Sequence, residues 1–138
     1  MDPQEFKLIV VGIIGIAVLV LGIGVPVIWG FRAHRAAADR ALQRIYEDLN
    51  LLEAAKSQEP KVGFVYHTYS GILVWSVQCT HRIEAPYEVA EVALRRFLGY
   101  TLKWGTFAYG GLLIVPLALG NYLVQKGKIR RQHASRLA

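Results

Sequence analysis

An uninterrupted apolar segment near the start of the chain most constrains how this sequence can fold. Residues 8–31 contain no charged side chain, although 19% of the 138 residues are charged. At about 1.5 Å per residue, about 20 apolar residues in a helix cross the roughly 30 Å hydrocarbon core of a bilayer. Trp29, Phe31 and Arg32 at the end of the segment suit the headgroup region. A cleaved signal peptide has a shorter apolar core, so we predict an uncleaved transmembrane helix over residues 8–31.

A second uncharged segment lies near the other end of the chain. Residues 105–125 contain no charged side chain, and Lys103 and Lys126 flank them. Pro116 lies inside the segment, which a membrane helix tolerates. We therefore predict a second transmembrane helix over residues 105–125.

The residues after the first apolar segment form a helical stalk. Residues 32–58 contain no Pro or Gly and are rich in good helix formers. Their apolar residues follow a heptad-like spacing, which predicts a seam made of Ala38, Leu42, Ile45, Leu49 and Leu52. The seam spans only about two heptads, so it needs a partner to be buried.

A second water-side helix is predicted over residues 86–104, directly before the second apolar segment. Pro86 is suited to the first helical position, and Glu91 is placed to pair with Arg95 one turn later. An apolar stripe along this amphipathic helix consists of Val89, Ala93, Phe97, Tyr100 and Trp104.

The segment between these helices, residues 59–85, has the composition of strands. Pro60 ends the stalk, and residues 62–69 are rich in β-branched and aromatic side chains. Polar and apolar side chains then alternate between residues 74 and 82. Ser70 and Gly71 suggest a tight turn, so we predict a β-hairpin. An alternative stays open, because residues 62–79 are also apolar enough for a weak third span.

The predicted fold is an α-helical membrane protein in which two transmembrane helices continue into water-side helices. These would form an antiparallel hairpin that buries its two stripes and carries the β-hairpin at its tip. Residues 1–7 would be a short N-terminal tail, and residues 126–138 a basic C-terminal tail. We expect a multi-pass protein of a bacterial inner membrane. The positive-inside rule favours a cytoplasmic location both for the middle region and for the C-terminal tail, and two spans cannot satisfy both.

Motifs for catalysis are missing from the sequence. It contains no Gly-x-Ser-x-Gly elbow, no P-loop and no haem-attachment motif, and neither apolar segment contains an ionisable residue. His67 and His81, on opposite strands of the predicted hairpin, and Cys79 near them are weak candidates for a metal site. The expectation is a protein that is not an enzyme and that needs no cofactor.

Small and basic residues suggest contacts with other helices and with lipid. Glycines allow close helix approach in membranes, and the candidates are Gly12, Gly15, Gly22, Gly110 and Gly111. The net charge is +6, and basic residues beside the spans are suited to anionic lipid headgroups. The candidates for headgroup contact are Arg32, Arg35, Lys126, Lys128, Arg130 and Arg131. No nucleic-acid-binding signature is present.

Three hypotheses for function follow. The favoured one is a non-catalytic accessory or scaffold subunit, which packs against other membrane protein subunits. A self-assembling homo-oligomer or small pore is the second, although no polar stripe marks either span. A metal- or haem-binding redox protein that uses His67 and His81 is the third.

Overall fold

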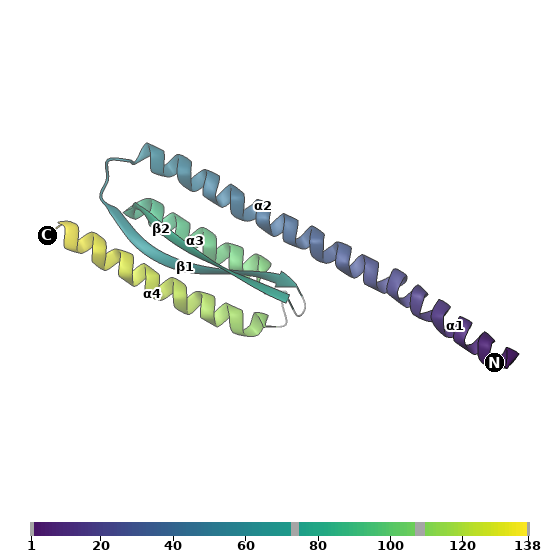
Figure 1. Cartoon of the computed structure of the whole chain (residues 1–138). Helices are drawn as coiled ribbons and strands as arrows, with labels where there is room; N and C mark the ends of the chain where they lie inside the picture. Colours follow the sequence, from purple (N-terminus) through teal and green to yellow (C-terminus); the bar gives the residue numbers. More distant parts are fainter. Residues whose placement is uncertain (1, 73–74, 107–109, 138) are drawn as a thin grey trace. The chain divides into compact units, whose positions relative to one another are not determined.

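A computed structural model describes residues 2–72, 75–106 and 110–137 of the chain (Figure 1). The chain divides into two compact units, Met1–His34 and Arg35–Ala138. The described residues form four α-helices, a π-helical turn and a two-stranded sheet. Their bounds are α1 Pro3–Leu19, η1 Val20–Gly24, α2 Val25–Ala55, β1 Lys61–Ile72, β2 Trp75–Pro86, α3 Tyr87–Trp104 and α4 Gly111–Leu137.

The first unit is helical almost from its first residue. The side chain of Asp2 accepts a hydrogen bond of 3.1 Å from the backbone N–H of Gln4, and Pro3 occupies the start of α1. Both features favour helix initiation. Residues 3–7 therefore belong to α1, whereas the sequence predicted a tail over residues 1–7.

A widened turn interrupts the first unit just before Pro26. In η1 the backbone N–H of Val25 bonds to the carbonyl of Val20, five residues earlier. Proline lacks an N–H, and its ring clashes with the carbonyl four residues before it, here that of Gly22. Because the wider turn gives the ring room, the helix continues past Pro26.

One candidate membrane span is present in the part of the chain that the structure describes. The helical stretch Pro3–Ala55 is long and apolar enough to cross a membrane, by length and composition alone. A signal sequence or the core helix of a soluble protein can pass the same test. In this chain the most apolar window of Pro3–Ala55 is 0% buried. The long apolar helix predicted from the sequence is therefore confirmed, and its location in a membrane stays a prediction.

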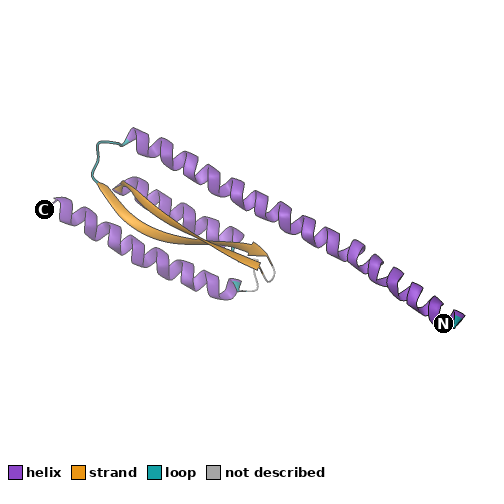
Figure 2. Cartoon of the chain, viewed as in Figure 1, coloured by secondary structure: helices purple, strands orange, loops and turns teal. Residues whose placement is uncertain are grey.

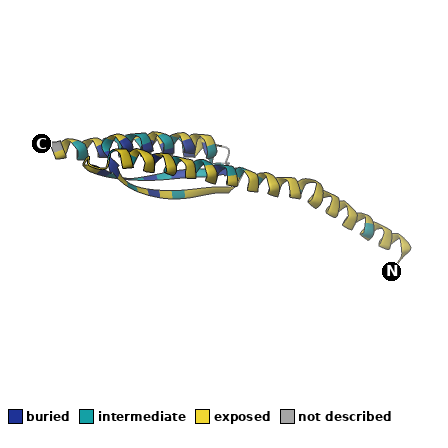
Figure 3. Ribbon diagram, turned by 90° about the horizontal axis from the view of Figure 1, so that it is seen from above, coloured by how far each residue is buried: buried dark blue, intermediate teal, exposed yellow. Residues whose placement is uncertain are grey.

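The second unit is a layer of three helices against one face of a β-hairpin (Figures 2 and 3). The strands β1 and β2 pair antiparallel, with Tyr66 opposite His81 and Val62 opposite Ala85. Alternate residues of a strand point to opposite faces, so Val62, Phe64 and Tyr66 enter the core together. The predicted hairpin is confirmed, and the weak third span over residues 62–79 is not formed.

The turn predicted at Ser70 and Gly71 is wrong. Both residues lie in β1, where they pair with Val77 and Ser76, and residues 73–74 between the strands lie outside the described residues. A Cβ at Gly71 would lie 2.1 Å from the carbonyl oxygen of Trp75. Glycine is needed here for the close approach of two strands, which from sequence alone resembles a turn signal.

The three helices of this unit run antiparallel to their neighbours, with α3 in the middle. On one side, Tyr46 of α2 contacts Phe97 of α3, and Lys56 near the end of α2 bonds to Glu88 at the start of α3. On the other side, Tyr87 of α3 stacks on His133 of α4, with ring centroids 4.4 Å apart. The start of α2 in this unit, the end of α3 and the start of α4 therefore lie at one end.

The hairpin lies along the helices, whereas the sequence predicted it at their tip. Val62, Phe64 and Tyr66 share one core cluster with Leu49 of α2, Phe97 of α3 and other buried apolar residues. A lone hairpin is marginal in water. Covering its apolar face with the helices removes this exposure, so the hairpin forms part of the core.

The predicted second span, residues 105–125, does not match the bounds of either α3 or α4. The helix α3 ends at Trp104, the N–H of Gly105 bonds to the carbonyl of Thr101 at 2.8 Å, and residues 107–109 lie outside the described residues. The next helix, α4, continues from the apolar residues through the basic C-terminal residues to Leu137. Its inner side is buried at Ile114 and Ala118, so α4 is a packed helix of the second unit.

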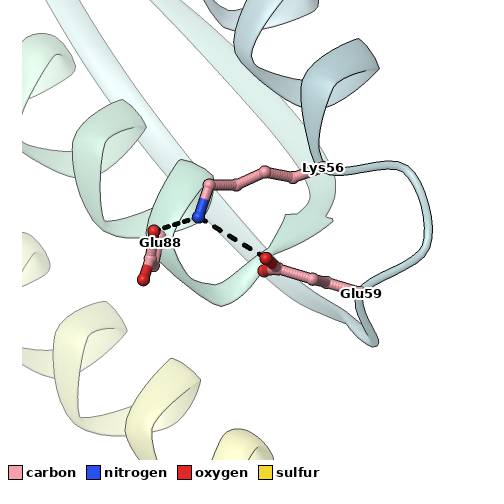
Figure 4. A network of polar contacts seen from close by, with 3 residues as sticks. All are labelled: Lys56, Glu59 and Glu88. Carbon is pink, nitrogen blue, oxygen red and sulfur yellow. Dashed lines mark hydrogen bonds and ion pairs between the residues drawn. The ribbon is translucent and has the colours of Figure 1, made fainter.

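Charged contacts gather at the end of this unit where β1 begins. Figure 4 shows Lys56 between two carboxylates, with Glu59 at 3.5 Å and Glu88 also in contact. Lys61 pairs with Glu53 at 2.7 Å beside this group. Exposed pairs of this kind contribute little to stability, so they mark a solvated end of the unit.

Candidate functional site

The imidazole of His81, on β2, is a buried titratable group of the described core. Its side chain is 6% exposed. Nδ1 lies 2.5 Å from the phenol oxygen of Tyr46 on α2, and Nε2 lies 2.7 Å from Oγ1 of Thr68 on β1. Both ring nitrogens are therefore hydrogen-bonded, and His81 links a helix to both strands.

An aromatic stack encloses this imidazole. The ring of Phe97 on α3 lies 4.6 Å from that of His81 and nearly parallel to it, and Tyr46 and Tyr66 each lie 5.9 Å from Phe97. Burial lowers the pKa of His81, and the nearby His67 lowers it further. The ring is therefore neutral at pH 7, with one nitrogen donating and the other accepting.

The buried phenol of Tyr66 is also hydrogen-bonded. The hydroxyl of Tyr66 donates to the backbone carbonyl of Ala118 on α4 at 3.2 Å. Burial, with smaller contributions from Tyr69 and Tyr122, raises the pKa of Tyr66 to about 12. This phenol stays protonated at neutral pH and joins α4 to β1. The hydrogen bonds of His81 with Tyr46 and Thr68 thus fix α2 on the hairpin. The hydrogen bond of Tyr66 fixes α4 on it in the same way.

The three weak candidates for a metal site do not share one face of the hairpin. His81 is opposite Tyr66 and Cys79 is opposite Thr68, both on the core face. His67 lies on the other face, where its Nδ1 contacts Oγ1 of Thr80 at 3.0 Å. Among the described residues, no group of three or more His, Cys, Asp or Glu side chains could hold a metal ion.

The candidate packing glycines fall into two groups. An added Cβ would meet nothing within 4 Å at Gly12, Gly15, Gly22 or Gly110. Gly111 differs, because a Cβ there would lie 2.2 Å from the carbonyl oxygen of Thr106. Gly111 is therefore needed inside this chain, whereas Gly12, Gly15 and Gly22 face open space on an exposed helix.

The stalk seam lies against the core of the second unit. Leu49 is buried in the core cluster, and Leu42 and Ile45 pack against it. Ala38 is also buried, whereas Leu52 is 37% exposed. The partner of the seam is thus the hairpin and α3 of the same chain.

The candidate headgroup residues are mostly exposed. Arg32, Arg35, Lys128, Arg130 and Arg131 are exposed, whereas Lys126 is half-buried. The Lys126 ammonium lies 3.7 Å from a carboxylate oxygen of Glu91 and over the ring of Tyr122. Lys126 therefore connects α4 to α3, and the other basic residues face outward.

Two surfaces of the chain expose large apolar side chains. One is the helix of the first unit, where neither α1 nor η1 contains a buried residue among those described. The other is the outer face of α4, where Leu112 is 92% exposed. Its further members are Leu113, Leu117, Leu119, Leu123 and Val124. Exposed apolar surface on this scale indicates contact with lipid or with another protein.

Sequence reasoning missed the two partners of His81. Tyr46 was one residue away from the predicted seam, and Thr68 read as an ordinary strand residue. The period-two pattern of β1 places Thr68 on the same face as Phe64 and Tyr66, which is the one available signal that it enters the core.

No family model, curated protein or solved structure matches this chain.

Proposed function

We propose that this protein is a non-catalytic accessory or scaffold subunit of a membrane protein assembly. The observation that carries the proposal is the exposure of the first unit. Leu8 is 73% exposed and Leu21 is 66% exposed, and residues 8–31 contain no charged side chain. A helix of this length and composition is stable in a bilayer, where its backbone bonds are internal and its side chains contact lipid or other helices.

Helix packing is the activity that this anchor supports. Gly12, Gly15 and Gly22 are spaced by three and seven residues, so they lie on one side of the helix. Small residues on one side let another membrane helix approach closely. The second unit would then hold a docking surface on the water side.

The buried polar groups of the second unit fit a structural role better than a chemical one. His81 uses both ring nitrogens within the chain, and Tyr66 donates to a backbone carbonyl. His67 lies on the face of the hairpin opposite His81, so a metal or haem site built on both is not part of the proposal.

In this proposal the chain crosses a bacterial inner membrane once. The apolar part of α4, from Gly111 to Val124, is about 20 Å long, which is shorter than the roughly 30 Å hydrocarbon core. Its inner side also packs on the hairpin through Tyr66 and Ala118. A multi-pass chain, as predicted from the sequence, would require α4 to leave these contacts.

The experiment is affinity purification of the tagged full chain from its native membrane in mild detergent, followed by mass spectrometry. Stoichiometric partner proteins are expected, and they would name the assembly. A chain that elutes without partners, as a monomer or as a homo-oligomer, would overturn the accessory role and favour self-assembly.

A matched pair of variants tests the helix side that makes the contact. Gly15→Leu adds bulk to the glycine side, and Ala17→Leu adds similar bulk to the opposite side of the same helix. Neither position is buried in the chain, so both variants should fold and insert. We expect Gly15→Leu to lose partner recovery while Ala17→Leu retains it; equal recovery would contradict packing through this side.

A further inference from the structure

The outer face of α4 divides into an apolar half and a basic half. Leu113 is 70% exposed and Leu117 is 60% exposed in the first half. In the second half the exposed side chains are Lys128, Arg130 and Arg131. A helix that is apolar on all sides is normally covered on all sides, yet here only the side with Ile114 and Ala118 is buried within the chain.

The charged side chains of α4 have one sign. After Glu91 the sequence contains no acidic residue, whereas basic residues recur on α3 and α4 up to Arg136. Exposed leucines that are followed along the same helix by basic residues favour acyl chains at one end of the helix and anionic headgroups at the other.

The apolar half lies at the same end of the second unit as Arg35, its first residue. Because α2 and α3 run antiparallel, as do α3 and α4, the start of α4 and the Arg35 end of α2 share one end of the unit. The charged contacts of Lys56 and Lys61 lie at the opposite end. The unit therefore changes along its length from an apolar end to a charged end.

We propose that the outer face of α4 lies in the interface of an anionic bilayer. Leu113, Leu117 and their exposed apolar neighbours contact the upper acyl chains, and Lys128 and Arg131 contact phosphate groups. This inference rests on the proposed membrane anchorage and deepens it, because it gives the second unit a lipid-binding face of its own. The face is too short to span and has basic residues at one end, which favours the interface over a transmembrane position.

The test measures the depth of single fluorescent labels on the reconstituted full chain. In a Cys79→Ser background, one cysteine is introduced by Leu117→Cys, by Ile14→Cys in α1 or by Glu84→Cys at the charged end. Each variant is labelled with an environment-sensitive dye and placed in vesicles of phosphatidylcholine and phosphatidylglycerol. The vesicles contain lipids with a nitroxide quencher, either near the headgroup or in the middle of the acyl chain.

The expected result distinguishes the three positions. The label at position 117 should lose most of its fluorescence to the shallow nitroxide and resist aqueous iodide, and the label at position 84 should behave in the opposite way. The label at position 14 should be quenched by the deep nitroxide. Leu113→Cys gives a second reading of the same face, so the test does not depend on one variant.

Other results would overturn the inference in separable ways. Iodide quenching at position 117 with lipid quenching at position 14 would reject the lipid-binding face and leave the anchorage intact. Protection from both quenchers, with dye self-quenching that disappears on dilution in lipid, would assign the face to a second copy of the chain. An unquenched label at position 14 would reject the anchorage and, with it, this inference.

Discussion

Tyr46 and His81 are joined by a hydrogen bond of 2.5 Å between the phenol oxygen and Nδ1, although they are 35 residues apart in the sequence. Thr68 occupies the other ring nitrogen at 2.7 Å, and Phe97 covers one ring face. A protonated ring could keep both partners, but it would place a charge in a largely apolar core. The cluster is therefore suited to a neutral imidazole.

Stability should fall as the pH is lowered below about 6.5. Burial, with the nearby His67, lowers the pKa of His81 in the folded chain, so the unfolded chain binds this proton first. Well above about pH 6.5 both states are neutral and His81 causes no pH dependence. As the pH falls toward the lowered pKa, the free energy of unfolding decreases. Urea unfolding of the full chain in detergent between about pH 7 and 5 measures this slope.

The matched variants for this slope are His81→Asn and His67→Asn. His81→Asn cannot titrate, so the slope should flatten whatever its effect on the midpoint. His67 lies on the other face of the hairpin, and its replacement should leave most of the slope in place. Equal slopes in the wild type and in His81→Asn would assign the pH dependence to other groups.

Phe97→Ala should cost about 3–5 kcal/mol of folding free energy. The side chain is fully buried and contacts the rings of Tyr46, Tyr66 and His81. Its removal leaves a cavity between α3 and the hairpin. Leu102→Ala, on the same helix but 36% exposed, is the control and should cost well under about 1 kcal/mol. Similar losses for the two variants in urea unfolding would contradict the central position of Phe97.

Two glycines of the α3 region should respond to alanine with opposite signs. A Cβ at Gly105 would lie 2.7 Å from the carbonyl of Thr101 and 2.9 Å from that of Tyr69, so Gly105→Ala should cost about 1–3 kcal/mol. Gly99 is an exposed helical residue with nothing within 4 Å of an added Cβ. Gly99→Ala should therefore stabilise by about 0.5–1 kcal/mol. Thermal melts of both variants check the signs.

Local patterns in the sequence predicted the elements of the second unit. The alternation between residues 74 and 82 predicted a strand whose two faces differ, and the stripe through Val89 and Phe97 predicted the buried face of α3. Both predictions depend only on the period of apolar residues, which the backbone geometry fixes.

The arrangement of the elements was harder to predict, because it depends on contacts between distant segments. Gly71 was interpreted as a turn residue, since sequence alone does not reveal that β2 passes within contact distance of its backbone. The apolar run containing Ile114 and Ala118 was assigned to a membrane, because burial by protein and burial by lipid require the same side chains. The role of His81 could not be predicted either, since its partners Tyr46 and Thr68 lie on two other elements.

The edge of β1 that does not pair with β2 is hydrogen-bonded to side chains of α3 and α4. The backbone N–H of Gly63 donates to Oε1 of Gln132 on α4 at 2.9 Å, and the N–H of Tyr69 donates to Oγ1 of Thr101 on α3 at 3.3 Å. An uncovered strand edge is a site for unwanted pairing, and these side chains occupy it. Gln132→Ala removes the acceptor of the Gly63 N–H, which should cost about 1 kcal/mol of local stability. Hydrogen exchange of the Gly63 amide should therefore rise about fivefold. The Tyr69 amide should keep its protection; a parallel rise at both amides would mean that the variant loosens the whole unit rather than this edge.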